Sequence, residues 1–238
     1  MYVAELVNQG KKMHQEFIDI IRNKLSELGA INVDSYIRKL EDNRNDNLQF
    51  DDLKCEDYAA LLFLHHGFSV EMRDSPDLRL FLDNNEFYAE VKHFRFKDQD
   101  RIDQEKMEAI KGMLTNIGET KKDPWDQIVD TAIEKVNQFI DGKPNILVIA
   151  SSSPHCIDDS IVQTAINKVE ELTTEQKYPG IEKLNGVLFL STDFNISQRR
   201  DVYFYRIESA VIPISTIVLE RFNQINGWHF LVKTYFGL

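Results

Sequence analysis

Two short runs of alternating apolar and polar residues flank Asp83-Asn84-Asn85, and they constrain the fold of this 238-residue chain more than any other feature. Asp and Asn favour turns, so the pattern predicts a β-hairpin over residues 76–96. If Asn84-Asn85 is the turn, one face of the hairpin is entirely apolar, because strand side chains alternate between faces. That face consists of Leu78, Leu80 and Leu82, paired with Val91, Ala89 and Phe87.

The opposite face of the predicted hairpin gathers charged residues. In this register Arg79 lies opposite Glu90, and Asp77 lies opposite Lys92. Directly opposed Cβ atoms are about 5 Å apart and diagonal ones about 7 Å apart. Two carboxylates at such spacing can share a divalent cation, and a neighbouring ammonium can hold an anionic substrate. A one-residue slip would bury these charges instead, so the apolar face specifies the register.

The order Pro76-Asp77 followed by Glu90-x-Lys92 resembles the PD-(D/E)xK superfamily, the restriction-endonuclease-like nucleases. Upstream, the segment from Glu56 to Gly67-Phe68 is similar to the first helix of that family, which has an early Glu and a Gly-Phe stop. The similarity covers residues 53–96 well and residues 123–150 loosely. It implies an α/β fold with a restriction-endonuclease-like mixed central sheet flanked by helices.

The resemblance also implies an activity, that of a metal-dependent endonuclease that hydrolyses phosphodiester bonds in DNA. Asp77 and Glu90, with the carbonyl of Val91, would hold Mg²⁺ or Mn²⁺. Lys92 would help to deprotonate the attacking water or neutralise the phosphate in the transition state.

Two further residues are candidates by the same resemblance. Glu56 would be a third acid at the metal site, although a favourable charge on the helix dipole explains it equally well. Gln127 lies in the first turn of a helix that starts at Asp123-Pro124. Several branches of the family place a Gln early in this helix, near the metal. The Tyr that usually follows four residues later is Thr131 here.

The charge of the chain is uneven. The net charge of −11 argues against simple coating of nucleic acid. Residues 41–57 carry seven acids and two bases, so they would repel nucleic acid or bind a basic protein partner. Residues 92–122 carry eight bases and six acids, and residues 97–122 are either a substrate clamp or a solvated loop. The candidate substrate-binding residues are Arg95, Lys97, Arg101 and Lys106.

The hydrophobic periodicity divides the chain into an N-terminal helical segment, residues 1–47, and a nuclease-like domain, residues 48–238. Helices are predicted over 2–28 and 33–40 in the first segment, which would be a cap, a homodimerisation element or a substrate-positioning arm. In the second, helices are predicted over 52–66, 102–114, 123–140, 158–172 and 215–225. Strands are predicted there over 68–73, 145–150, 185–191, 202–205 and 210–214.

Two other classes of function stay open on the sequence alone. The chain could be a catalytically silent member of the same fold that binds nucleic acid or protein. It could also be a generic α/β protein in which Lys92 only pairs with Asp77 across the strands. No run approaches the 18 apolar residues of a membrane helix, and the first residues do not resemble a secretory leader. With two distant cysteines, this predicts a cytoplasmic protein with reduced thiols.

Overall fold

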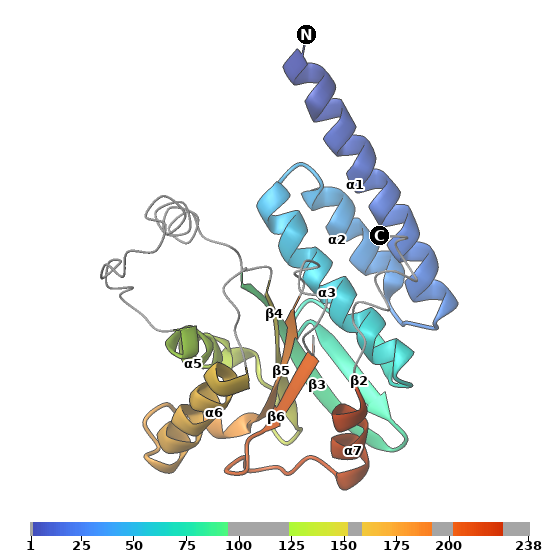
Figure 1. The fold of residues 1–238 in the computed structure, drawn as a ribbon. Coiled ribbons are helices and arrows are strands. Elements are labelled where there is room, and N and C mark those ends of the chain that lie inside the picture. Colours follow the sequence, from blue (N-terminus) through green and yellow to red (C-terminus); the bar gives the residue numbers. More distant parts are fainter. Residues whose placement is uncertain (1, 95–123, 152–158, 192–201, 226–238) are drawn as a thin grey trace, which may run out of the picture.

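A six-stranded mixed sheet with helices on both faces forms the centre of the molecule (Figure 1). The structure is a computed structural model, and it describes residues 2–94, 124–151, 159–191 and 202–225. The strands are β1 (Ser69–Met72), β2 (Leu78–Leu82), β3 (Asn85–Phe94), β4 (Asn145–Ser151), β5 (Leu184–Ser191) and β6 (Val202–Arg206). The helices are α1 (Tyr2–Glu27), α2 (Val33–Asn43), α3 (Asn47–His65), α5 (Pro124–Lys135), α6 (Asp159–Thr174) and α7 (Thr216–Gln224), with single 3-10 turns at Val136–Gln138 and Ile181–Lys183.

The strands lie in the sheet in the order in which they follow along the chain. β3, β4 and β5 are parallel, whereas β1, β2 and β6 pair antiparallel with their neighbours. Every residue of β4 is buried, as expected for a central parallel strand that is covered on both faces. The predicted mixed α/β architecture is therefore confirmed.

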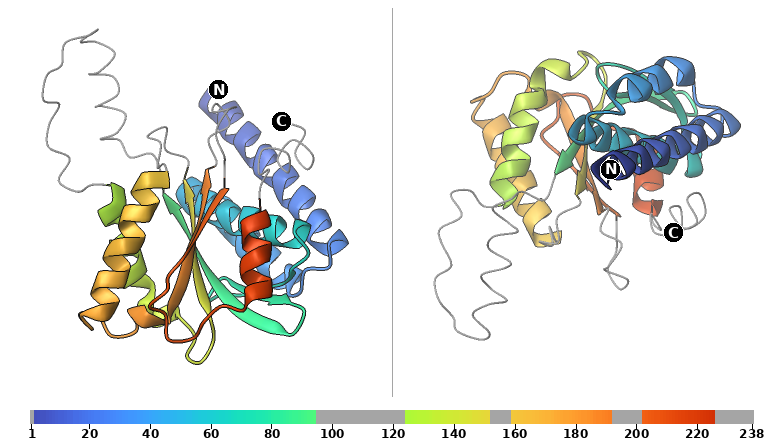
Figure 2. Two further views of the ribbon diagram at one scale, coloured as in Figure 1. Left: turned by 60° about the horizontal axis from the view of Figure 1, so that its bottom comes forward. Right: turned by 90° about the horizontal axis from the view of Figure 1, so that it is seen from above.

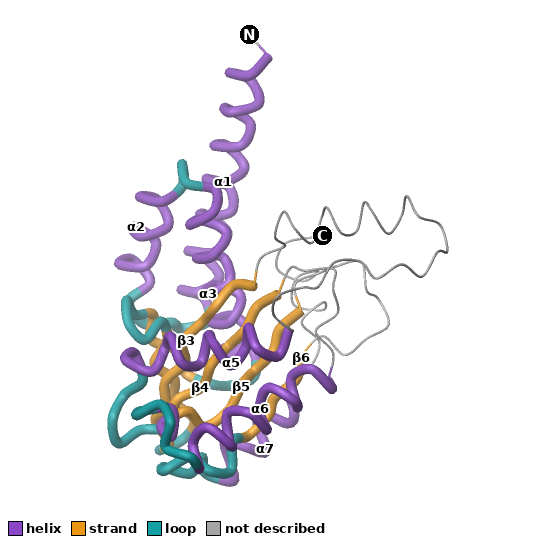
Figure 3. The backbone as a smooth tube through the Cα atoms, turned by 90° about the vertical axis from the view of Figure 1, so that its left-hand side faces the viewer, coloured by secondary structure: helices purple, strands orange, loops and turns teal. Residues whose placement is uncertain are grey.

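Helices cover both faces of the sheet (Figures 2 and 3), and an apolar core lies on each face. α1, α2, α3 and α7 pack on one face, in a core that includes Ile21, Phe63 and Phe222. α5 and α6 pack on the other face, in a core that includes Ile128 and Val162. The N-terminal helices thus share one core with the strands of the hairpin. None of the helices in the described ranges has the length and apolar composition needed to cross a membrane.

The hairpin forms as predicted, but its register differs by two residues. Leu82 pairs with Asn85, so the turn is Asp83-Asn84 rather than Asn84-Asn85. Asp83 has a φ of 52°, in the left-handed region that Asp tolerates better than most residues. A shift of two residues keeps the alternation of faces, so the predicted apolar face is confirmed. Its members are all buried: Leu78, Leu80, Leu82, Phe87, Ala89 and Val91.

The predicted charged pairs across the hairpin are wrong, because each depended on that register. Arg79 lies opposite Tyr88 rather than Glu90. Its guanidinium pairs instead with Glu86 at 2.7 Å and Glu71 at 3.2 Å. Asp77 lies just before β2, and its side chain binds the backbone of β3.

One predicted helix boundary and one predicted strand are also wrong. α3 begins at Asn47, because the side chain of Asp46 accepts hydrogen bonds from two free N–H groups of the first turn. Asp52, the residue at which this helix was predicted to begin, lies inside α3 and contacts His93 at 3.1 Å. The predicted strand at 210–214 is irregular, since Pro213 lacks an N–H for a ladder and the Ile212 carbonyl accepts a hydrogen bond from the Asn185 side chain.

Candidate active site

The candidate site lies at the start of β2, beside the longer strand β3. The first residue of β2, Leu78, pairs with Ala89, so β3 continues past it with no antiparallel neighbour among the described strands. The N–H of Val91 points to this open side and donates to Asp77 Oδ2 at 2.8 Å. The N–H and C=O of a strand residue point toward the same neighbouring strand, so the Val91 carbonyl faces the same gap.

Glu90 enters the site from the face of the sheet that α5 covers. Its side chain is 3% exposed, and Oε1 accepts from Lys135 Nζ at 2.5 Å. Oε2 is buried and has no hydrogen-bond partner among the described residues. A buried carboxylate oxygen without a donor is costly, so this atom is an open position for a cation or a donor.

Glu56 enters from the other face, on the third turn of α3. Both of its carboxylate oxygens accept from Lys39 Nζ, at 3.1 and 3.2 Å. Lys39 belongs to α2, so the N-terminal helical segment contributes a side chain to the site. Beyond Leu78 no β2 residue lies beside β3. The charge of Glu90 on one face of the sheet therefore acts on Glu56 on the other face.

Burial and mutual repulsion shift the ionisation of this cluster. Burial raises the pKa of Asp77 to about 8, helped by the charges of Glu56 and Glu90 and opposed by the Val91 N–H. Burial also raises the pKa of Glu56 to about 7, and Glu90 adds to the shift while Lys39 opposes it. The ionised forms of Asp77 and Glu56 are therefore costly at this site, and a bound cation would offset that cost.

Asp57, next to Glu56 on α3, is a buried acid that the sequence did not single out. It is fully buried, and neither carboxylate oxygen has a hydrogen-bond partner among the described residues. The nearby Tyr36 hydroxyl donates to the Leu53 carbonyl at 2.7 Å instead. Burial, followed by the charge of Glu56, raises the pKa of Asp57 well above its ordinary value, which favours the neutral acid.

The oxygen atoms at the site suit a hard divalent ion, although the described residues do not form a complete coordination shell. No group of three or more His, Cys, Asp or Glu side chains in the described ranges is arranged to hold a metal. The fitting set contains only two side chains: Asp77 and Glu90, with the Val91 carbonyl. The unpartnered Oε2 of Glu90 and the raised pKa of Asp77 are both features that a cation would relieve.

The other predicted site residues lie at different places. Lys92 is half-buried on the same strand face as Glu90, and no ion pair holds it among the described residues, so the predicted pairing with Asp77 is wrong. Gln127 lies in the first turn of α5, about 12 Å along the helix axis from Lys135. No hydrogen bond in the described ranges joins the Gln127 side chain to the carboxylates. Outside the described residues lie Arg95, Lys97, Arg101 and Lys106.

Sequence reasoning missed Lys39 and Lys135, the two lysines that bind the carboxylates. A signal for Lys135 was present, because it follows Ile128 by seven residues and Ala132 by three, and both of these are fully buried. Such spacing places Lys135 on the apolar stripe of α5. A charged residue on that stripe needs a buried counter-charge, which the pattern alone could not identify as Glu90.

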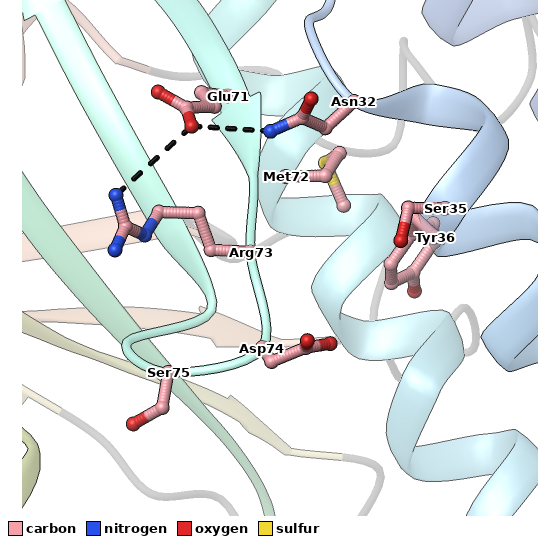
Figure 4. A pocket seen from close by; sticks show the side chains of 8 residues that line it. All are labelled: Asn32, Ser35, Tyr36, Glu71, Met72, Arg73, Asp74 and Ser75. Carbon is pink, nitrogen blue, oxygen red and sulfur yellow. Dashed lines mark hydrogen bonds and ion pairs between the residues drawn. The ribbon is translucent and has the colours of Figure 1, made fainter.

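A polar pocket of about 420 Å³ lies between the start of α2 and the loop that precedes Asp77 (Figure 4). In Figure 4 the Asn32 amide and the Arg73 guanidinium both point to the Glu71 carboxylate. Tyr36 also lines the pocket, and after burial the charges of Asp57, Glu56 and Asp77 raise the pKa of its phenol. Tyr36 is thus a lining residue of the pocket that also lies within electrostatic range of the carboxylate cluster.

The raised pKa values predict how the stability of the metal-free protein depends on pH. Folded Asp77 and Glu56 keep protons that the unfolded chain releases above pH 4 to 5, so the free energy of unfolding should fall on the order of a few kcal/mol between pH 5 and 8. Chemical denaturation in EDTA measures this, and Asp77→Asn should flatten the slope. Hydrogen bonding, chiefly from Lys143, lowers the pKa of Glu86 to about 2. The ionisation of Glu86 therefore affects stability only below this pH range. A slope identical in wild type and variant would contradict the assignment.

Comparisons with known proteins add no family assignment. No family model matches the chain, and neither curated proteins nor solved structures give a significant match. The functional interpretation therefore depends on the motif and the geometry of the site.

Proposed function

We propose that this chain is a metal-dependent endonuclease with a restriction-endonuclease-like fold, and that DNA is its substrate. One observation carries the proposal: buried Asp77, Glu90 and Glu56 come from the loop before β2, from β3 and from α3, and the charges of Glu56 and Glu90 raise the pKa of Asp77. Three buried acids are costly to hold together unless a cation stabilises them, and such clusters occur most often at functional sites.

Each residue has a distinct role in the proposed reaction. Asp77 and Glu90, with the Val91 carbonyl, would hold Mg²⁺ or Mn²⁺, which would polarise the phosphate and activate a bound water. Lys92 projects from the same strand face as Glu90 and is not engaged in an ion pair among the described residues, so its ammonium is available to a phosphate. There it would stabilise the negative charge that develops on the phosphoryl oxygens.

A direct test is a cleavage panel with the purified full chain. Linear, nicked, branched and single-stranded DNA, with single-stranded RNA as a comparison, would be incubated with Mg²⁺, Mn²⁺ or EDTA. The proposal predicts cleavage of at least one DNA substrate that requires the metal and disappears in Asp77→Asn. Cleavage that persists in Asp77→Asn would indicate a contaminating nuclease, and no cleavage of any substrate would contradict the enzyme.

Binding of DNA by so acidic a chain should depend on its one mildly basic stretch. Neutral substitution of the four candidate bases should reduce the slope of log affinity against log salt concentration by up to about 4, since each phosphate contact releases about one counterion. The bases are Arg95, Lys97, Arg101 and Lys106. Fluorescence anisotropy of Asp77→Asn at several salt concentrations measures the slope. An unchanged slope would place the DNA-binding surface elsewhere.

A catalytically silent binding module is the second candidate, and the Lys135–Glu90 ion pair favours it. An ammonium at 2.5 Å from one of the proposed metal ligands stabilises that acid without any metal. A silent module should bind DNA or a protein without binding Mn²⁺, whereas the proposed enzyme should bind both. Calorimetric titration of wild type with Mn²⁺ separates the two candidates.

A further inference from the structure

Two lysines hold the carboxylates of the site where a cation would bind. Lys135 reaches Glu90 from α5, and Lys39 reaches Glu56 from α2 on the opposite face of the sheet. Glu90 belongs to the proposed metal-ligand set, and one of its two oxygens already accepts from an ammonium at 2.5 Å. A divalent ion that needs Glu90 must therefore compete with Lys135, whereas Lys39 contacts an acid outside that set.

The charges of the neighbouring lysines also weaken the attraction of the site for a divalent ion. Lys39 pairs with Glu56 and Lys135 pairs with Glu90, so two of the three acids already have a counter-charge. The negative charge is thus largely compensated before any metal arrives. A divalent ion gains less free energy from a compensated site than from an open carboxylate cluster, so metal alone should bind weakly.

We propose that Lys135 competes with the divalent ion for Glu90 and, once displaced, pairs with a phosphate of the substrate. Metal and nucleic acid then bind cooperatively, and this inference rests on the proposed function.

The displaced ammonium needs a new counter-charge. The Lys135 side chain is 19% exposed, and α5 is fixed against the sheet by Ile128 and Ala132, which are fully buried. A largely buried ammonium without a counter-charge is costly. A substrate phosphate is the anion that the proposed reaction brings to this place. By linkage, nucleic acid that binds Lys135 must raise the affinity for the metal, and the metal must raise the affinity for nucleic acid by the same factor.

Calorimetric titration with Mn²⁺ alone tests the competition. Lys135→Met should bind Mn²⁺ about tenfold tighter than wild type, because the competing charge is gone. Lys135→Gln, which can still donate a hydrogen bond to Glu90, is the second variant in case the methionine variant unfolds. Lys39→Met is the matched control, since it removes the same charge from the same site. Its affinity should rise only about two- to threefold, through general electrostatics.

A second titration, with a short DNA duplex of hydrolysis-resistant phosphorothioate linkages present, tests the coupling. The duplex should raise the Mn²⁺ affinity of wild type, and this gain should shrink in Lys135→Met and Lys135→Gln. If the folded Lys135 variants bind Mn²⁺ as wild type does or more weakly, Lys135 does not compete and the inference fails, while the metal site stands. If neither wild type nor any variant binds Mn²⁺, the metal site of the proposed function fails with it.

Discussion

Lys92→Ala should lower the rate of DNA cleavage by about a thousandfold while leaving Mn²⁺ affinity close to that of wild type. Lys92 is not a ligand of the proposed metal, and no ion pair with Asp77 or Glu90 holds it in the described ranges. Its removal therefore leaves the donor set intact. What is lost is the positive charge next to the phosphate, which matters most in the transition state. Single-turnover kinetics at saturating Mn²⁺, with calorimetry on the same preparation, measure both quantities.

Lys143→Ala is a suitable control for this experiment, because it removes an ammonium that pairs with Glu86, outside the carboxylate cluster. It should leave both the cleavage rate and the metal affinity unchanged. Turnover of Lys92→Ala at the wild-type rate would remove Lys92 from the mechanism. Loss of Mn²⁺ binding in Lys92→Ala would instead mean that Lys92 holds the carboxylates in place.

Asp77→Asn and Glu90→Gln should each abolish detectable cleavage and Mn²⁺ binding. Asp77→Asn should lose little stability, whereas Glu90→Gln should be less stable because it leaves the Lys135 ammonium without its counter-charge. The amide oxygen of an Asn at position 77 can still accept from the Val91 N–H, which the Asp77 carboxylate does at 2.8 Å. An uncharged side chain also removes repulsion from Glu56 and Glu90, so the melting temperature of the metal-free Asp77→Asn variant should rise at pH 8.

Glu86→Gln is the matched control for the two acid substitutions. Glu86 lies on the same strand as Glu90, but it pairs with Arg79 and Lys143 away from the cluster. This variant should keep metal binding and cleavage and lose only surface ion pairs, which contribute little to stability. Equal loss of activity in all three variants would indicate damage to the strand rather than loss of metal ligands.

The faces of the hairpin could be predicted from the sequence, whereas its register could not. Alternation of Leu78, Leu80 and Leu82 with polar residues determines which side chains are buried, and a shift of two residues leaves that alternation unchanged. Asp83, Asn84 and Asn85 are all turn-forming residues, so the sequence did not distinguish the two possible turns. The shift placed Asp77 beside Val91 and Glu90 rather than opposite Lys92.

The electrostatic environment of the acids could not be predicted because it comes from contacts between distant segments. Lys39 and Glu56 are 17 residues apart, and Lys135 and Glu90 are 45 residues apart. Local periodicity gives no information on which helix covers which part of a sheet. Asp57 was missed for a related reason: an acid next to Glu56 in an acidic stretch looks like a solvated charge, and only the packing of α2 on α3 buries it.

The central claim is that Asp77, Glu90 and the Val91 carbonyl form one metal site, and anomalous scattering from crystals grown with Mn²⁺ tests it most directly. The proposed function predicts an anomalous peak within ligand distance of the Asp77 and Glu90 carboxylates and the Val91 carbonyl, with Lys135 Nζ moved away from Glu90. No peak at this site at saturating Mn²⁺ and pH 8, with Lys135 still 2.5 Å from Glu90, would contradict it.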